Sequence, residues 1–493
     1  MILQASCKAH PVHTLPWKRS SIISHRANYP LKNRLCSQVR SPFHLSSPTS
    51  THTYTPRCAQ SSSQVPPAPA GVFVDTSPST SSQQGLIFSL GQPGSWDDTG
   101  VGHPVVRYYL GDNEQRWFMW YTGRSTTCPN LDDVYPSSGS IGVAISDDGV
   151  TWSRGRGAIE GARGEGRAAD VGKVLSPNKD WWWHDTLHMH VSDVQILSNN
   201  AVGGGTGVYW CFYSGGSFET TAEVPSSMMS VDDGDEASGT VSTSSTTTTA
   251  TTTTNREGVT LRPGLAMSQD GRNWARIEAD HHTGALFDVG APGEWDSLFI
   301  GAPQVINSGP GDMRMYYHSY DASRDKFIIG LATSPDGFNW TKQGPVFEGG
   351  RPESEDFDAR GVASRCVVVD PDTRKYFMFY EAVAWNGGRS IGLAVSDDGK
   401  GTWRRHPHPV FTPACSSSDG CDDAGEAWDQ GAVGTPCAVP MAKGKWRLYY
   451  SGRKGVSAGP WEGIGLALSE DGVVNNGTDN APVKFKRRTT GGI

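Results

Sequence analysis

The sequence predicts an all-β protein built from repeated units. Three observations carry the prediction: much glycine and proline, many aromatic residues, and a short phrase that recurs five times. The 493 residues include 59 Gly and 31 Pro, with no G-X-Y period. The chain also contains 17 Trp, 16 Phe and 15 Tyr, whereas only 19% of its residues are charged. This composition is typical of strands joined by turns, and it is too aromatic for a chain disordered throughout.

The recurring phrase is an Asp-Gly turn that follows a short apolar strand. Each copy has Ser two residues before the Asp, and a Trp follows in four of them. The copies occupy residues 146–152, 268–274, 334–340 and 396–403, with a shortened fifth copy at 469–472. An Asp-Gly pair between two strands is a strong hairpin signal. We therefore expect five hairpins whose Asp residues serve the turns rather than chemistry.

Two further phrases recur at matching intervals. An aromatic residue or His followed by Asp opens each repeat, and a strand that ends in Tyr comes next. The opening aspartates are Asp97, Asp185, Asp296, Asp358 and Asp429. Five copies predict a five-bladed β-propeller of four-stranded antiparallel blades over residues 85–490. Two smaller tandem β domains are the competing layout, which a single shared repeat disfavours.

Residues 1–74 differ in composition from the repeats. They contain no Asp or Glu and eight Lys or Arg, and they are rich in Ser, Thr and Pro. An acid-free leader of this kind is typical of an organellar transit peptide, and it lacks the apolar core of a secretory signal. We expect import into the chloroplast (plastid stroma), with the mitochondrion as the alternative. A disordered tail without an address is the third possibility.

One insertion interrupts the second repeat. Residues 219–258 are polar and contain the Thr-rich tract 246–251. A segment of this composition lacks the apolar side chains needed for a core. We therefore expect a disordered surface loop.

Charge and cysteine spacing exclude several classes of partner. The net charge of −8 argues against nucleic-acid binding, and no stretch of 18 apolar residues predicts a membrane span. No Cys-x-x-Cys pair is present, so a structural zinc site is not expected. We expect no metal and no cofactor; a site made of His184, His188 and His190 is the open alternative.

Positions at which one repeat departs from the others carry the functional information. In the expected fold the start of the first strand and the end of the second share one face of the central channel. After the second-strand Tyr, three repeats have Thr122, Ser214 and Ser451, whereas the other two have His318 and Glu381. Acids, histidines and arginines are thus expected at one mouth.

Such a mouth suits hydrolysis of a glycosidic bond. One carboxyl group protonates the leaving oxygen while another activates water or attacks carbon, and neighbouring carboxylates split their pKa values. The candidate catalytic residues are Asp97, Asp98, Asp193, Asp296 and Glu381. The candidate ligand-binding residues are Arg124, His188, His190, His318, Asp358, Arg360, Arg365, Asp429 and Arg453.

The hairpins and the Trp-Asp openings resemble those of the glycoside hydrolase five-bladed propellers of the arabinanase–levansucrase–invertase superfamily (family 43- and 32-like), here in a plant or algal plastid-type member. The resemblance covers roughly residues 85–490. It implies an Asp base on the first blade, a second Asp that tunes pKa and orients substrate, and a Glu acid.

The match to that catalytic pattern is incomplete. The family's first-blade Asp usually precedes a Pro directly, whereas His103 precedes Pro104 in this sequence. The resemblance then leaves Asp97 or Asp98 as base and Asp193 or Asp296 as second acid. It makes Glu381 the proton donor.

Two functions follow as hypotheses. The first is a glycoside-hydrolase-like propeller that acts on a carbohydrate by acid/base catalysis with paired carboxylates. The alternative is a non-catalytic propeller that binds a carbohydrate, a phosphorylated metabolite or a protein partner in its central funnel. A carboxylate pair within roughly 5–10 Å across the mouth favours the enzyme. Acids that are all tied to backbone or arginine favour the binder.

Overall fold

The computed structural model describes residues 83–110, 115–126, 139–155, 170–197, 207–225, 228, 253–352, 354–371, 373–414, 427–455, 459–469 and 484–489. Contacts divide the chain into residues 1–67 and 68–493, and only the second part contains described residues. The predicted leader 1–74 and the Thr-rich tract 246–251 lie outside the described residues. The described part consists of strands and turns with very little helix, such as the short 3₁₀ turn at Ala442–Gly444, so the predicted all-β class is confirmed.

Most strands belong to five modules, each made of four antiparallel strands in chain order. Module 1 contains β2 (Gly100–Leu110), β3 (Gln115–Arg124), β4 (Ser140–Ser146) and β5 (Ser153–Arg154). Module 2 contains β7 (His188–Leu197), β8 (Val208–Gly216), β11 (Leu261–Ser268) and β12 (Ala275–Ile277). Module 3 contains β13 (Gly301–Asn307), β14 (Met313–Asp321), β15 (Lys326–Ser334) and β16 (Thr341–Phe347).

Modules 4 and 5 follow the same pattern. Module 4 contains β17 (Gly361–Val369), β18 (Tyr376–Val383), β19 (Arg389–Ser396) and β20 (Arg404–Arg405). Module 5 contains β21 (Ala432–Pro440), β22 (Trp446–Arg453), β23 (Gly463–Ser469) and β24 (Phe485–Arg487). A single parallel bridge between β15 and β17 joins modules 3 and 4. Among the described strands, no hydrogen-bonded sheet closes on itself.

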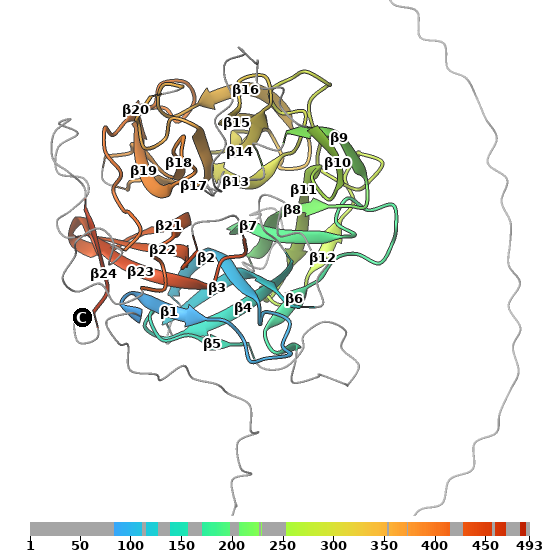
Figure 1. Cartoon of the computed structure of the whole chain (residues 1–493). Coiled ribbons are helices and arrows are strands. Elements are labelled where there is room, and N and C mark those ends of the chain that lie inside the picture. The colour runs from blue at the N-terminus through green and yellow to red at the C-terminus, as the bar shows by residue number, and fades with distance from the viewer. Residues whose placement is uncertain are drawn as a thin grey trace, which may run out of the picture. The chain divides into compact units, whose positions relative to one another are not determined.

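The first strands of the modules contact one another in chain order. β2 contacts β7, β7 contacts β13, β13 contacts β17, and β17 contacts β21, which in turn contacts β2. Figure 1 shows these five strands facing a common centre. Two of the remaining strands are β1 (Leu86–Ser89), which pairs with β23, and β6 (Lys173–Leu175), which pairs with β4. The first described strand therefore lies in the sheet of the last module.

The repeated phrases meet inside each module. The second-strand Tyr stands directly across from the Gly of the third strand, as with Tyr121 and Gly142. A Cβ on Gly142 would lie 2.8 Å from the Tyr121 ring and 2.5 Å from Trp96, so only glycine leaves room for both rings. The aromatic residue of the opening phrase packs on the same Tyr, with 5.4 Å between the ring centroids of Trp96 and Tyr121. The same Tyr–Gly pairing occurs in the other modules at Tyr213–Gly264, Tyr317–Gly330, Tyr380–Gly392 and Tyr450–Gly465.

The Asp-Gly hairpins have the expected turn chemistry in the four copies that the structure describes. The carboxylate of Asp148 accepts the backbone N–H groups of Val150 and Thr151, each at 2.7 Å. Gly149 has φ 71°, in the left-handed region that favours glycine, and donates to Ser146 Oγ at 2.9 Å. These aspartates serve their turns; the fifth copy, beyond residue 469, lies outside the described residues.

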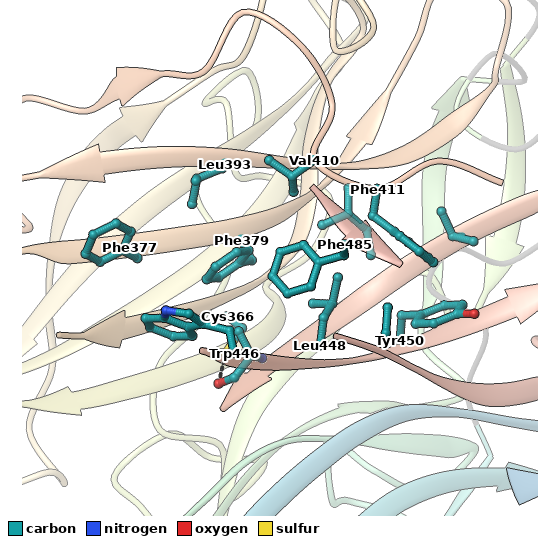
Figure 2. Close-up of a cluster of buried hydrophobic side chains, with 14 residues drawn as sticks. Cys366, Phe377, Phe379, Leu393, Val410, Phe411, Trp446, Leu448, Tyr450 and Phe485 are labelled. Carbon is teal, nitrogen blue, oxygen red and sulfur yellow. Dashed lines mark hydrogen bonds between the residues drawn. The ribbon is translucent and has the colours of Figure 1, made fainter. Parts of the chain in front are cut away.

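The hydrophobic core is divided among the junctions between neighbouring modules. Figure 2 shows the junction of modules 4 and 5, where Phe377, Phe379 and Trp446 pack with Phe485. Phe379 and Trp446 lie 5.6 Å apart between ring centroids. Burying each such aromatic side chain contributes roughly 1.5–3 kcal/mol, so adjacent modules stabilise each other.

The prediction for residues 219–258 needs a correction at both ends of the segment. β9 (Thr220–Pro225) and β10 (Thr253–Glu257) form an antiparallel pair. Val224 and Met228 are buried in an apolar cluster with Tyr320, Phe327 and other side chains of modules 3 and 4. These two apolar residues anchor the start of a segment whose overall composition is polar.

Candidate functional site

The five opening aspartates are each held inside their own module. Each is buried and forms an ion pair with a cation on the fourth strand of the same module. The pairs are Asp97–Arg154 at 2.8 Å, Asp185–Arg276 at 2.7 Å, Asp296–Lys342 at 2.9 Å, Asp358–Arg405 at 2.7 Å and Asp429–Arg487 at 2.8 Å. In four modules the aspartate also accepts the hydroxyl of the second-strand Tyr, from Tyr121, Tyr317, Tyr380 or Tyr450. We call the Asp, Tyr and cation of one module its acid cluster.

This arrangement gives the five opening aspartates a structural role inside their modules. A buried carboxylate is stable only when it is paired and hydrogen-bonded, and each module supplies its own partners. Asp97 and Asp296, candidates for catalysis, are therefore each paired with a cation of their own module. Asp358 and Asp429, candidates for ligand binding, are occupied in the same way.

The other two aspartates among the candidates are also engaged. Asp98 accepts the backbone N–H groups of Gly94 at 2.7 Å and Thr126 at 3.3 Å. Asp193 forms an ion pair with Arg107 and accepts the N–H of Val305 at 3.1 Å. Burial raises the pKa of Asp193, an effect that the guanidinium of Arg107 opposes.

A β-bulge near the start of each first strand shapes the centre of the molecule. The strand register breaks between Gly102 and Val105 in module 1, and at the equivalent place in the other four modules. His103 has φ 52° within this bulge, a left-handed conformation that costs a non-glycine residue roughly 1 kcal/mol or more. Bulges re-aim side chains, and this one places the His103 ring beside the His190 ring of module 2.

The residue after each second-strand Tyr bonds to the first strand of the next module. Thr122, Ser214 and Ser451 accept backbone N–H groups through their hydroxyls, and Glu381 does so through its carboxylate. The donors are Val191 N at 3.2 Å, Ala302 N at 3.0 Å, His103 N at 3.0 Å and Thr435 N at 3.0 Å, respectively. His318 makes the corresponding contact with Arg365 of module 4, at 3.3 Å. The positions that vary between repeats therefore join neighbouring modules.

Glu381 is fully engaged at this position. Its Oε2 accepts the N–H of Thr435, and its Oε1 forms an ion pair with Arg389. The side chain is completely buried. Both oxygens accept hydrogen bonds from the protein, which leaves neither aimed at a ligand as a proton donor.

Three imidazoles gather at the centre, and we call His103, His190 and His318 the central histidine cluster. The rings of His103 and His190 lie 4.9 Å apart between centroids. Among the described residues, neither ring nitrogen of His190 has a hydrogen-bond partner, and the same holds for Nε2 of His103. Both side chains are buried. Unpaired buried nitrogens of this kind cost free energy that a bound ligand can recover.

The central imidazoles are uncharged at neutral pH. Burial lowers the pKa of His103 to about 4. Burial, followed by the neighbouring His103 and His318, lowers the pKa of His190 well below its ordinary value. The pKa of His318 is lowered by burial and by the Arg365 guanidinium. Each neutral ring offers one donor and one acceptor nitrogen.

One aromatic side chain covers this region. Trp461 lines a small pocket together with His103, Thr122 and Arg124. A Cβ on Gly102 would lie 2.8 Å from Trp461, so the ring lies close against the first strand of module 1. Trp461 was not predicted from the sequence, because this tryptophan has no counterpart in the other repeats. His103 stood out only as a departure from the Asp-Pro pattern of the resembled family.

The remaining candidates bind protein groups around the centre. His188 shares a hydrogen bond of 2.8 Å with the carbonyl of Gly258, and burial lowers its pKa to about 4. Arg360 forms an ion pair with Asp325 at 3.4 Å. Arg365 donates to the carbonyl of Tyr316 at 2.6 Å. Arg453 donates to two backbone carbonyls and lies over the Trp461 ring, at 5.0 Å from its centroid.

The structure does not bring His184, His188 and His190 together as a set of metal ligands. His184 packs on Tyr213, and its Nδ1 lies 3.1 Å from the carbonyl oxygen of Thr283. Neither ring nitrogen of His190 has a hydrogen-bond partner among the described residues. Within the part of the chain that the structure describes, no group of three or more His, Cys, Asp or Glu is arranged to hold a metal ion. The described residues also include no helix long and apolar enough to cross a membrane.

Solved structures similar to this chain include glycoside hydrolases. A glycosyl hydrolase from Bacteroides ovatus is 14% identical with a TM-score of 0.47, and the match covers 82% of this chain and 96% of that one. A thermostable family-43 glycoside hydrolase is 16% identical with a TM-score of 0.47, and the match covers 81% and 97%. An N-acetylgalactosamine deacetylase from F. plautii, in complex with blood group B trisaccharide, is 15% identical with a TM-score of 0.46, and the match covers 79% and 95%.

The resemblance expected from the sequence is confirmed to this extent: glycoside hydrolases are among the structural neighbours. Identities near 15% and TM-scores below 0.5 carry no argument about what this chain does. No family model matches the sequence. No curated protein matches it either.

Proposed function

We propose that this protein is a five-bladed β-propeller that binds a carbohydrate at its central histidine cluster and does not hydrolyse it through paired carboxylates. The five modules serve as the blades. Contacts of module 5 with module 1 support this arrangement, because they repeat those between the other neighbours. Ser451 accepts the N–H of His103, and the hydroxyl of Tyr449 donates to the carbonyl of Gly149 at 2.8 Å. The latter contact corresponds to that of Trp120 with Gly271, between modules 1 and 2.

The observation that carries the binding proposal is the set of buried, unpartnered nitrogens on His103 and His190. Sugar hydroxyls both donate and accept hydrogen bonds, so they match neutral imidazoles that offer one nitrogen of each kind. Trp461 supplies an aromatic face beside His103 at the same pocket. The pocket has a volume of about 10 Å³, so a sugar would bind there only after Trp461 moved.

The contacts of the candidate acids disfavour hydrolysis by paired carboxylates. All seven candidate acids at the centre or the module openings are bound by cations or backbone N–H groups of the protein: Asp97, Asp98, Asp193, Asp296, Asp358, Glu381 and Asp429. A glycosidase of this kind needs one protonated acid and one free carboxylate flanking the bond. Among these candidate acids, only Asp429 keeps a buried carboxylate oxygen, Oδ1, without a hydrogen-bond partner among the described residues.

A glycan array that includes neutral and phosphorylated sugars tests the proposal, followed by calorimetric titration of the retained sugar. We expect wild-type protein to retain a neutral sugar, His190→Ala to lose at least tenfold in affinity, and His408→Ala to bind as wild type. His408 is an exposed histidine on module 4 and serves as the matched control. Retention of phosphorylated sugars alone would instead assign binding to Arg124 and Arg365. Retention of no sugar would overturn the proposal.

Hydrolysis is the second candidate function, because Glu381 lies near Trp461 at the centre. A Cβ placed on Gly434 would lie 2.6 Å from the Glu381 carboxylate and 2.8 Å from the Trp461 ring. If a ligand drew Arg389 away, Glu381 would be positioned to act as an acid. A panel of aryl glycosides decides this: turnover by wild type with loss of at least 100-fold in Glu381→Gln would favour the enzyme.

We also propose that residues 1–74 direct import into the plastid. The support is the acid-free, Ser-rich and basic composition of this segment. Residues 1–74 fused to a fluorescent protein should accumulate in the plastid stroma. Mitochondrial or cytosolic fluorescence would contradict the proposal.

A further inference from the structure

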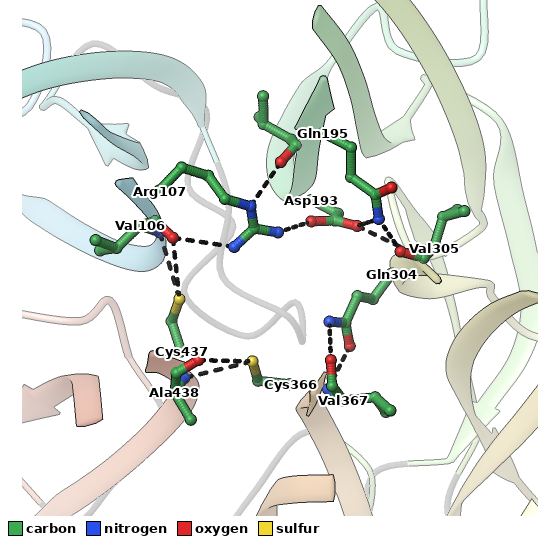
Figure 3. A network of polar contacts seen from close by, with 11 residues as sticks. Val106, Arg107, Asp193, Gln195, Gln304, Val305, Cys366, Val367, Cys437 and Ala438 are labelled. Carbon is green, nitrogen blue, oxygen red and sulfur yellow. Dashed lines mark hydrogen bonds and ion pairs between the residues drawn. The ribbon is translucent and has the colours of Figure 1, made fainter. Parts of the chain in front are cut away.

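A second set of contacts joins the first strands of neighbouring modules, one position beyond the bulges. In each case a side chain on one first strand accepts a backbone N–H from the next. Val305 N donates to Asp193 at 3.1 Å, and Val367 N donates to Gln304 at 2.7 Å. Figure 3 shows these contacts together with the Arg107–Asp193 ion pair. These contacts add to the hydrogen bonds that join neighbouring modules near the centre.

Two of the acceptors in this network are thiols. Ala438 N donates to Cys366 Sγ at 3.3 Å, and Val106 N donates to Cys437 Sγ at 3.3 Å. Cys366 belongs to β17 and Cys437 to β21, which are contacting first strands of modules 4 and 5. A thiol is a weak acceptor where modules 2 and 3 use a carboxylate and an amide. Thiols at these positions therefore form weaker hydrogen bonds than a carboxylate or an amide would, but they are chemically reactive.

The Cys366 sulfur lies close to the backbone next to Cys437. Cys366 Sγ lies 3.3 Å from the backbone nitrogen of Ala438, which is covalently attached to Cys437. Standard backbone dimensions place that nitrogen about 2.4 Å from the Cys437 Cα, so the sulfur lies within about 6 Å of this Cα. A disulfide needs the two Cα atoms to lie roughly 4.4–6.8 Å apart, a separation that the contact between β17 and β21 allows. Figure 3 shows both sulfurs in the same small region between the strands.

The surroundings favour a thiolate on one of the two residues. The pKa of Cys437 is lowered by its hydrogen bond with the Cys366 thiol and by the Arg107 guanidinium. The pKa of Cys366 is raised by the same pair interaction and by burial. The Arg107 side chain is 29% exposed, whereas Cys366 and Cys437 are buried. Cys211 lacks these features, and burial raises its pKa far above the ordinary value.

We propose that Cys366 and Cys437 are a redox modification site at which hydrogen peroxide forms a reversible disulfide joining modules 4 and 5. The Cys437 thiolate attacks one peroxide oxygen, a sulfur–oxygen bond forms, the O–O bond breaks, and the departing hydroxide takes a proton to become water. The Cys366 thiol then loses its proton and attacks this sulfur. The S–S bond forms, the S–O bond breaks, and a second water leaves. Two thiols are thus oxidised while one peroxide is reduced to two waters.

Peptide mapping of the full-length protein tests the proposal directly. The protein is treated with hydrogen peroxide, blocked with an alkylating agent and digested after glutamate. This digestion separates the relevant cysteines, because peptide 356–381 contains only Cys366 and peptide 427–462 contains only Cys437. We expect these two peptides joined with a mass about 2 Da below their sum, and separated again by dithiothreitol.

Two controls sharpen the experiment. Cys211, the third free cysteine that the structure describes, should remain a thiol and become alkylated once the protein is unfolded. Cys366→Ser should leave peptide 427–462 unlinked, whereas Cys211→Ser should leave the cross-link unchanged. Recovery of both peptides alkylated, or of Cys437 oxidised to a sulfinic acid without a cross-link, would overturn the proposal. The wild-type map decides the question even if a variant does not fold.

Discussion

The acid clusters of the five modules and the central histidine cluster are both buried and polar, yet they are built in opposite ways. In an acid cluster, the Asp finds a cation and usually a tyrosine hydroxyl within its own module. In the central cluster, His103 and His190 come from different modules and keep nitrogens that no described residue binds. In each acid cluster the aspartate finds its partners inside one module. In the central histidine cluster, ring nitrogens are left that could bind a ligand.

The contrast indicates how functional residues can be distinguished from structural ones in a repeat protein. An acid that recurs in every repeat, such as Asp358, is explained by the stability of one module. A departure from the repeat has to be judged by its contacts. Glu381 departs from Ser and Thr but still serves the contact between modules, whereas His190 makes no such contact through its ring. Four predictions test the contrast, in order of decreasing effect on stability.

Asp358→Ala should be the most disruptive change. It leaves the partly buried Arg405 and the buried Tyr380 hydroxyl without their shared acceptor. Removing one partner of a buried ion pair costs about 3–5 kcal/mol. Urea unfolding should record a loss of this size. Asp397→Ala, which breaks an exposed pair with Arg404, is the control and should destabilise the protein much less, because solvent screens such pairs. Equal losses for the two variants would contradict a special role for the acid cluster.

The central cluster should make stability depend on pH. The pKa of folded His103 is about 4, below the ordinary value of 6.5, so the unfolded chain binds the proton more tightly. The stability that a neutral, buried His103 contributes is therefore complete above pH 6.5 and is lost as pH falls toward 4. For this one group the loss is about 3 kcal/mol.

Urea unfolding at pH 7, 5.5 and 4.5 measures this dependence, with His103→Gln as the comparison. The variant should lose less stability than wild type over this range, because Gln does not titrate. A pH dependence identical in the two proteins would mean that His103 takes up its proton equally in the folded and unfolded states.

Gly392→Ala should test the packing within an acid cluster. The new Cβ would lie 2.3 Å from the Tyr380 ring, on the face against which the opening Phe357 also packs. Forcing a methyl group into a packed site costs typically 1–3 kcal/mol, so we expect about 2 kcal/mol in thermal or urea unfolding. Gly401→Ala is the control, since nothing lies within 4 Å of its added Cβ. A stable Gly392→Ala protein would show that the Tyr can move without cost.

His190→Leu should have the smallest effect on stability. The substitution removes two buried nitrogens that lack partners among the described residues, and an apolar side chain of similar size replaces them. Such exchanges are nearly neutral or stabilising, so the free energy of unfolding should change by less than about 1 kcal/mol. Sugar binding should nevertheless be lost. A destabilisation above 2 kcal/mol would show that the ring supports the fold instead.

Much of the fold could be predicted because its signals are local. Asp336 and Gly337 specify a hairpin through bonds that span three residues, so the turn is legible in the sequence. The Gly of each third strand and the Tyr of each second strand recur because they meet in the same module. The ordered ends of the insertion were not predicted, because only two apolar residues, Val224 and Met228, pack into the core from an otherwise polar segment.

The sequence by itself determined the all-β class, the repeated modules, their hairpins and the positions at which the repeats differ, because each of these depends on residues near one another in the chain. Only the tertiary structure decided what the acids and histidines do. Asp97 meets Arg154 across 57 residues, and His103 meets His190 across a junction between modules. Whether a buried polar group is satisfied depends on such distant partners, and the spacing along the chain does not encode them.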